Sequence, residues 1–282
     1  MNQVTIAKPF IKWVGGKRNL LSDIIPLLPN NIENYYEPFM GGAAVFYNVK
    51  KYVKQRCYLS DFNDELVNCY LQVRDYSDDL IEELKLYKNT KEFFEEIRNM
   101  DRMSDFKNSC KIKRAARFIY LNRTAFNGMW RVNKKNQFNV PYGKYIKNFE
   151  PDVKTISEAS QALQDVILKE QNFSDILEDV KEGDFVYLDP PYVPISSTSA
   201  FTSYTHQGFG NDLQIELLDL CKNLSRKGVN FMQSNSNAEL IYEMYNDFHI
   251  TEVMASRTIS AKGSGRSKVK ELIITNYIKK AP

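Results

Sequence analysis

The decapeptide GDFVYLDPPY at residues 183–192 decides the fold, because it describes a buried strand that ends at a carboxylate. Residues 185–188 form a short apolar run of β-branched and aromatic side chains, which predicts the strand. The two prolines after Asp189 lack backbone N–H donors and fix two φ angles, so the strand cannot continue. In an open α/β sheet, ligands bind at the carboxyl ends of the strands. We therefore expect Asp189, the Pro190 carbonyl and the Tyr192 ring to face a ligand, although a Pro-rich turn with a solvated aspartate is the alternative.

Length and composition indicate a globular protein. The chain has 282 residues, 43% of them hydrophobic, which is enough for one large α/β domain with an insertion or for two domains. Its first residues lack the charged start and apolar stretch of a signal peptide, and no apolar run approaches the length of a membrane span. The cysteines have no paired spacing and lie in or beside apolar patterns, so we expect reduced thiols that are buried or half-buried, and no metal site. They are Cys57, Cys69, Cys110 and Cys221. These features predict a cytoplasmic protein without membrane contact.

Positive charge is concentrated in one segment of the chain. The net charge is +3, yet residues 106–149 contain eleven Lys or Arg and no Asp or Glu, which leaves 27 basic and 35 acidic residues elsewhere, a balance of −8. Two stretches of this segment, NRTAFNGMWR at 122–131 and NVPYGK at 139–144, are basic, aromatic and rich in asparagine. Arg and Lys neutralise phosphates, Asn and Arg read base edges, and an exposed aromatic ring can wedge into a base stack. The segment predicts a nucleic-acid partner, although its charge alone suits any polyanion.

Two turns near the N-terminus favour nucleotide binding. At residues 11–18, IKWVGGKR places two glycines and Lys17 ahead of an apolar helix pattern, an arrangement that favours an anion but also occurs in ordinary turns. At residues 35–44, YYEPFMGGAA runs from an aromatic strand into a Gly-Gly turn and a helix of small residues. This is the geometry of a nucleotide-binding crossover, although the glycine spacing is not that of the dinucleotide fingerprint.

A second predicted strand, at residues 57–61, ends in an acidic residue. Asp61 follows Gly41 by twenty positions, where a carboxylate would hold the two hydroxyls of a ribose. The alternative is that Asp61 caps the helix that begins near Asn63. The spacing favours the ribose.

Four motifs in this order resemble those of the Dam-type, D12 class DNA adenine N6-methyltransferases, and the resemblance covers nearly the whole chain. They are KWxGGK from Lys12, EPFxGG from Glu37, SDxN from Ser60 and DPPY from Asp189. The resemblance implies S-adenosylmethionine (SAM) as the methyl donor and adenine in duplex DNA, within GATC, as the substrate. It implies catalysis by Asp189, Pro190 and Tyr192. The implied SAM contacts are Trp13, Lys17, Phe39, Gly41, Asp61, Phe173 and Asp189.

The basic segment corresponds to the target-recognition region of that family. Phe126 stands where an aromatic side chain intercalates, Asn127 where a polar side chain fills the gap, and Arg131 where a guanidinium reads guanine. Apolar contacts that discriminate a base pair are implied for Met129 and Pro141. Phe126 replaces a frequent tyrosine, which puts a phosphate contact of the hydroxyl in doubt. The complete set of expected DNA contacts is Lys12, Arg123, Phe126, Asn127, Met129, Arg131, Pro141 and Lys144.

We therefore expect a Rossmann-like α/β methyltransferase with an inserted helical domain. Residues 1–75 and 150–282 would form the SAM-binding catalytic domain, with a seven-stranded and mostly parallel sheet by resemblance, and residues 76–149 the DNA target-recognition domain. Helical signals start at the expected N-caps Ser77 and Thr90. Further strands are predicted at 166–170, 229–234, 248–255 and 271–277, the last two as an antiparallel pair. Two loops are expected to meet substrate, a flap at 196–210 and a phosphate-binding loop or solvated hairpin tip at 257–270.

Two other classes of function share some of these features. A methyltransferase acting on RNA or protein would share the SAM turn, but it does not explain the match of the basic insertion. A noncatalytic DNA-binding protein would tolerate changes at Asp189 or Tyr192, and none is present. We expect a monomer that acts separately from any restriction endonuclease of the same system. The residues leave open whether the enzyme is solitary and regulatory or the protective half of such a system.

Overall fold

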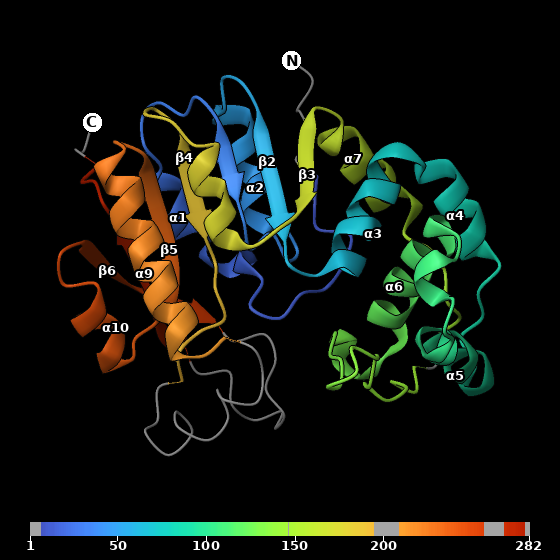
Figure 1. Ribbon diagram of the computed structural model, residues 1–282. Helices are drawn as coiled ribbons and strands as arrows, with labels where there is room; N and C mark the ends of the chain where they lie inside the picture. The colour runs from blue at the N-terminus through green and yellow to red at the C-terminus, as the bar shows by residue number, and fades with distance from the viewer. Residues whose placement is uncertain (1–6, 146, 195–208, 257–267, 280–282) are drawn as a thin grey trace. The chain divides into compact units, whose positions relative to one another are not determined.

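The computed structural model describes residues 7–145, 147–194, 209–256 and 268–279, and it contains a mixed seven-stranded sheet with flanking helices (Figure 1). The strand order is β3-β2-β1-β4-β5-β7-β6. Strands β2, β1, β4 and β5 pair in parallel, and β7 runs antiparallel to both β5 and β6. The strands are β1 (Tyr35–Glu37), β2 (Cys57–Asp61), β3 (Val166–Glu170), β4 (Phe185–Leu188), β5 (Asn230–Ser236), β6 (His249–Ser256) and β7 (Lys268–Thr275). The predicted Rossmann-like α/β fold is confirmed.

Strand β4 lies between β1 and β5 and is buried along its whole length. Its start is fixed by the buried carboxylate of Asp184, which accepts hydrogen bonds from the backbone and side chain of Asn34 and from the backbone N–H of Lys181. From β1 the sheet continues with β2 and β3 to one edge, and from β4 it continues with β5, β7 and β6 to the other edge. The order therefore reverses between β1 and β4, which is the point where open α/β sheets bind ligands.

The chain divides into two compact units. The first comprises the segment up to Gly16, Gly41–Tyr47 and Asn63–Glu170; the second comprises Lys17–Met40, Asn48–Phe62 and the segment from Gln171 onward. The expected insertion at 76–149 lies within the first unit. Each unit has its own buried side chains.

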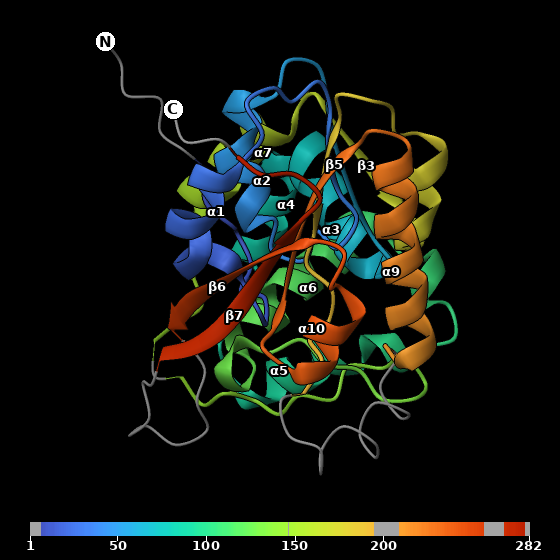
Figure 2. The same ribbon diagram turned by 90° about the vertical axis from the view of Figure 1, so that its left-hand side faces the viewer.

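The second unit carries most of the sheet. Helix α9 packs against β5 and against η6, and it lies beside β5 in Figure 1. Figure 2 shows β6 and β7 as a long twisted pair, and η1 packs against β6. The core between α9 and the sheet includes Leu217, Leu220, Phe231 and Ile274. The helical segments of this unit are η1 (Lys17–Leu20), α1 (Leu21–Leu27), η2 (Lys50–Tyr52), η6 (Phe173–Glu178), α9 (Asn211–Arg226) and α10 (Glu239–Met244). Helix α2 (Ala44–Val49) begins in the Gly41–Tyr47 segment of the first unit and ends in the Asn48–Phe62 segment of the second.

The first unit is built around helix α6 (Lys111–Thr124), which contacts α3, α4 and α5. Its residues from Arg114 to Asn122 are all buried, so α6 is the centre of this unit rather than an exposed basic face. The other segments are α3 (Asp64–Asp75), α4 (Ser77–Lys85), α5 (Lys91–Asn99), η3 (Met100–Arg102), η4 (Phe106–Asn108), η5 (Phe126–Gly128) and α7 (Val153–Leu163). The predicted helical signals that start near Ser77 and Thr90 are confirmed by α4 and α5.

Two local predictions in this unit were wrong. Thr90 caps α5 as predicted, but Ser77 is the first residue of α4, and the N-cap position belongs to Tyr76, which makes no side-chain cap bond. Cys110, at the N-cap position of α6, is exposed rather than buried or half-buried, whereas the other three cysteines are buried; all four are free. Within the described residues, no helix combines the length and the apolar character that a bilayer crossing needs.

Candidate active site

Asp189 directly follows β4, and its carboxylate is held in an ion pair. Lys17 Nζ, at the start of η1, lies 2.7 Å from Asp189 Oδ1, and the two side chains are only 5% and 20% exposed. Burial raises the pKa of Asp189 above its ordinary value, the neighbouring Lys17 ammonium opposes that rise, and the negative charge of Glu271 adds to it. The site therefore contains a partly buried carboxylate that is paired with the Lys17 ammonium.

Tyr192 is held from two sides. Its hydroxyl donates a hydrogen bond to Glu271 Oε2 at 2.7 Å, and the Lys17 ammonium lies 4.8 Å from the centroid of its ring. Burial raises the pKa of Tyr192 well above its ordinary value, and the charges of Asp189 and Glu271 raise it further. The phenol thus stays protonated and remains a donor. Glu271 was not predicted as a site residue.

The backbone after Asp189 is fixed by β5 and α9. The Val193 N–H donates to Asn235 Oδ1 at 3.4 Å, and the hydroxyl of Ser236 donates to the Val193 carbonyl. From α9, the side-chain amide of Gln214 donates to the Pro191 carbonyl at 3.4 Å. Residues 189–194 have no regular secondary structure, as the two prolines require. The side chains of Asn235, Ser236 and Gln214 therefore supply hydrogen bonds that a neighbouring strand would otherwise make with this backbone.

Aromatic rings gather after the end of β1. Phe39 stacks on Phe173 with ring centroids 5.1 Å apart, and both rings lie 5.8 Å from Phe209. Phe173, one of the expected SAM contacts, is buried in this cluster. Phe209 lies at the edge of the expected 196–210 flap; residues 195–208 are outside the described residues, as are residues 257–267 of the second expected loop.

Asp61 is the last residue of β2, and the Ser60 carbonyl accepts the N–H of Met40 at 3.0 Å. The carboxyl ends of β1 and β2 are thereby joined. The side chain that caps α3 is that of Asn63, which accepts the Leu66 N–H at 3.1 Å. Asn63 is therefore the N-cap of the helix, the role that was the alternative interpretation of Asp61.

Trp13 and Gly41, the two remaining expected SAM contacts, meet in the first unit. Gly41 has a φ of +44°, and a Cβ atom there would lie 2.5 Å from Cδ1 of Trp13. No other residue type fits this approach without displacement. The hydroxyl of Tyr70 donates to the Gly41 carbonyl at 3.1 Å, which fixes the turn from the other side.

Several of the expected DNA contacts are brought together by Asn122, a fully buried residue of α6. Its side-chain amide donates to the Lys12 carbonyl at 2.7 Å and to the Gly128 carbonyl at 3.2 Å, and its oxygen accepts the Lys12 N–H at 2.8 Å. Asn122 therefore fixes Lys12 beside η5, where Phe126 is 50% exposed and Asn127 has a φ of +57°. Sequence reasoning had noted Asn122 only as part of a loop.

The C-terminal part of the basic segment is linked to the same turn. The Phe126 N–H donates to the Pro141 carbonyl at 2.9 Å. Arg123 lies in an ion pair with Asp152, with 3.4 Å between the closest atoms. Met129 is half-buried, and Lys144 is exposed.

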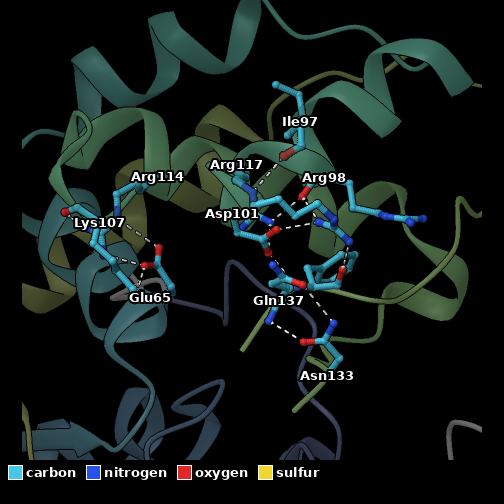
Figure 3. A network of polar contacts seen from close by, with 11 residues as sticks. Glu65, Ile97, Arg98, Asp101, Lys107, Arg114, Arg117, Asn133 and Gln137 are labelled. Atoms are coloured by element: carbon cyan, nitrogen blue, oxygen red, sulfur yellow. Dashed lines mark hydrogen bonds and ion pairs between the residues drawn. The ribbon is translucent and has the colours of Figure 1, made fainter. Parts of the chain in front are cut away.

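A short hairpin, residues 131–139, carries Arg131. Val132 and Phe138 form an antiparallel bridge, and Arg131 Nε donates to Asn139 Oδ1 at 2.8 Å. The buried Phe138 donates its N–H to Asp101 Oδ2 at 2.7 Å, so the hairpin is attached to the network around Asp101 (Figure 3). The exposed guanidinium of Arg131 is thus oriented by a side chain and a buried anchor.

Part of the positive charge of residues 106–149 is neutralised inside the first unit. Arg114 is buried and lies 2.5 Å from Glu65 Oε1, and Arg117 is buried and lies 2.6 Å from Asp101 Oδ2 (Figure 3). Burial lowers the pKa of Arg117, and the Asp101 carboxylate opposes that change. The expectation that the whole segment is directed at a partner was therefore wrong for these two arginines.

Comparison with known proteins identifies a family. A family model described as D12 class N6 adenine-specific DNA methyltransferase matches residues 13–259. A Type II methyltransferase of Lactococcus lactis subsp. cremoris is 44% identical over 274 residues, which cover 96% of this chain and 95% of that protein. A Type II methyltransferase of Methanocaldococcus jannaschii is 41% identical over 288 residues, covering 96% and 99%. The DNA adenine methylase of Vibrio cholerae is 35% identical over 271 residues, covering 94% and 95%.

Proposed function

The chain belongs to the D12 class of N6 adenine-specific DNA methyltransferases, and from this premise we propose that it transfers the methyl group of SAM to the 6-amino group of adenine in GATC sites of duplex DNA. The observation that carries the proposal is the partly buried Asp189 carboxylate, placed by β4 at the switch point of the sheet and followed by a fixed Tyr192. Family membership also answers the two rival interpretations, since the family is enzymatic and acts on DNA.

The residues at the carboxyl ends of β1, β2 and β4 fit SAM. Asp61 offers a carboxylate for the ribose hydroxyls, and the aromatic cluster of Phe39 and Phe173 offers ring faces for the adenine. Lys17 and Asp189 offer opposite charges for the amino-acid end of SAM, in keeping with the charge of its carboxylate and ammonium groups. Trp13 and Gly41 are the remaining SAM contacts that we propose, on the resemblance to the family. When bound, SAM supplies an electrophilic methyl group.

Asp189, Pro190 and Tyr192 would activate the target adenine. The lone pair of the adenine amino nitrogen is delocalised into the ring, so this nitrogen is a poor nucleophile. Asp189 and the Pro190 carbonyl would accept its two N–H bonds, which localises the lone pair toward the methyl group for an in-line displacement. The base must leave the duplex to reach these groups, and the Tyr192 ring would stack on it.

Recognition of DNA would fall to the surface that Asn122 and the 131–139 hairpin organise. The half-exposed Phe126 ring suits insertion into the base stack, and Asn127 follows it in the turn. Arg131 would read guanine, with Met129 and Pro141 providing apolar contacts to a base pair. Lys12, Arg123 and Lys144 would contact phosphates. Residues 76–149 remain our proposed target-recognition domain.

The biological setting is proposed on the relatives alone. Two similar proteins are Type II methyltransferases, which favours a chain that protects DNA against a restriction endonuclease acting as a separate protein. We expect the enzyme to act as a monomer in the cytoplasm.

The decisive experiment is methyl transfer from labelled SAM to duplexes with one GATC site, together with digestion of DNA from expressing cells by nucleases that differ in their sensitivity to adenine methylation. We expect label in N6-methyladenine and a protected digestion pattern. Label in a duplex without GATC at the same rate would overturn the proposed site, and label in cytosine would overturn the proposed base.

A further inference from the structure

Glu271 is a carboxylate of the sheet that lies within hydrogen-bond distance of Tyr192, and no role has been assigned to it. It sits on β7, opposite Ser236 of β5 and opposite Val253 of β6. Its backbone is therefore paired on both sides. A side chain mounted on such a paired strand is a more rigid acceptor than one on a loop.

The hydrogen bond to Glu271 holds the hydroxyl end of the Tyr192 ring, while the Lys17 ammonium lies 4.8 Å from the ring centroid. Val193, the next residue, is fixed by Asn235 and Ser236, so the backbone position of Tyr192 is set by β5. This leaves the two side-chain torsions of Tyr192. The 2.7 Å bond from its hydroxyl to Glu271 restricts both of them, because the phenol oxygen lies at the far end of the ring.

The neighbouring carboxylate on the hairpin provides a contrast. Lys270 precedes Glu271 and lies 2.7 Å from Glu252 of β6, and Glu252 also accepts a hydrogen bond from Tyr242 at 2.8 Å. Side chains alternate along a strand, so Lys270 and Glu271 lie on opposite faces of β7. One hairpin thus holds two carboxylates that each accept a tyrosine hydroxyl, and only Glu271 does so at the site.

We propose that Glu271 is a positioning residue of methyl transfer, whose carboxylate holds the Tyr192 ring in the orientation that stacks on the flipped adenine. This inference rests on the proposed function. It predicts that the carboxylate acts through the hydroxyl of Tyr192, so that removal of either group has the same consequence. A hydrogen bond with a charged partner gives an expected loss of about 10- to 100-fold in kcat for Glu271→Ala.

A double-mutant cycle tests this coupling. The variants are Glu271→Ala, Tyr192→Phe and their combination, with Glu271→Gln as the variant that keeps an acceptor and Glu252→Ala as the matched control. We expect the double variant to be no slower than the slower single variant, because both changes break one contact. Glu271→Gln should retain most of the wild-type kcat, and Glu252→Ala should match the wild type.

A second readout separates positioning from general support of the fold. A duplex with 2-aminopurine at the target position reports the environment of the flipped base, and looser stacking on Tyr192 should raise its emission with Glu271→Ala but not with Glu252→Ala. The KM for SAM should change less than twofold. Independent effects that multiply in the double variant, or a wild-type kcat in Glu271→Ala, would overturn the inference. Failure of the wild-type protein to methylate adenine would instead overturn the proposed function.

Discussion

At the scale of single residues, Asp189 has the features that an acceptor for an amino group needs. It is paired with the Lys17 ammonium, largely removed from water, and placed by the end of a central strand. We expect Asp189→Ala to abolish methyl transfer while the fold and the affinity for DNA are retained. By analogy with an oxyanion donor, the loss is about 2.7 to 4 kcal/mol of transition-state stabilisation. The measurement is single-turnover methylation, with DNA affinity and the thermal midpoint as controls. A variant with more than about a tenth of the wild-type rate would exclude this role.

The charged neighbours of Asp189 affect its pKa in opposite directions, and kcat should follow that pKa. The groups facing it are Lys17 from η1, Tyr187 and Tyr192 of its own segment, and Glu271 from β7. Burial and Glu271 raise the pKa of Asp189, and Lys17 lowers it. Because Asp189 must be ionised to accept, kcat falls as the pH falls through this pKa.

Removing each charged neighbour should therefore move the acid limb of the kcat profile in its own direction. Glu271→Gln removes a negative charge, so the pKa of Asp189 falls and the limb moves to lower pH. Lys17→Met removes the cation, so that pKa rises and the limb moves to higher pH. The profiles are to be measured at saturating SAM and DNA, so that kcat rather than binding is compared. Shifts in the same direction would show that the limb belongs to another group.

The residues of the site differ in how far the sequence alone could identify them. Asp189 and Tyr192 belong to one short motif, and the prolines between them indicate where the strand ends. Glu271 hydrogen-bonds Tyr192 across 79 positions, and Asn122 contacts Lys12 across 110. Contacts of this kind depend on which strands and helices become neighbours, and no local pattern specifies them.

At the scale of elements, the 131–139 hairpin carries one side chain suited to a base edge, Arg131, and another suited to a DNA phosphate, Lys134. The Asn139 side chain accepts a hydrogen bond from Nε of Arg131, so we expect the two terminal nitrogens of the guanidinium to serve a base edge. Lys134 is exposed near the tip and has no planar fork, so it suits a phosphate.

Arg131→Ala should cost about 1 to 3 kcal/mol on the preferred site and flatten the preference at one guanine. Lys134→Ala should instead weaken binding to all duplexes about equally. The test is methylation kinetics on the GATC duplex and on each single-base variant of it. If Arg131→Ala slows every substrate by the same factor, Arg131 contacts phosphate, and specificity belongs to Asn127, Met129 and Pro141.

The hairpin is attached to the buried network around Asp101, which should matter for stability. Asp101 accepts hydrogen bonds from Arg117, Arg102 and the backbone of Phe138 (Figure 3). Asp101→Ala leaves the buried Arg117 guanidinium without its carboxylate, so we expect a loss of about 3 to 5 kcal/mol in the free energy of unfolding. The exposed pair of Lys85 with Glu82 on α4 is the control, and Lys85→Ala should cost less than about 1 kcal/mol. Equal losses in urea denaturation would contradict a structural role for the network.

Elements were predictable where the pattern is local. The run at 185–188 became β4, and 166–170 became β3 with the predicted bounds, because short apolar runs between turn residues specify strands. The expectation that all basic residues of 106–149 face a partner was wrong for Arg114 and Arg117. The sequence does not show that α6 is surrounded by other helices, or that these two arginines pair with Glu65 and Asp101.

At the scale of the whole molecule, charge is distributed unevenly along a chain of small net charge. The net charge of +3 predicts little attraction to DNA, whereas residues 106–149 hold eleven basic and no acidic residues. Arg114 and Arg117 are internally paired, but Lys134, Lys135 and Lys144 are exposed. We therefore expect attraction to DNA to follow the local charge of this segment rather than the net charge.

Two triple variants of equal net charge test this expectation. The first replaces Lys134, Lys135 and Lys144 by Gln, and the second replaces the exposed cations Lys51, Lys181 and Arg226 of the second unit. Each lost phosphate contact should reduce the slope of log K against log[salt] by about 0.9. The first variant should therefore lose up to about 2.7 units of slope, and the second should keep the wild-type slope. Binding of a duplex without GATC, measured at several salt concentrations, gives both slopes, and equal reductions would show that DNA responds to the net charge of the molecule rather than to this segment.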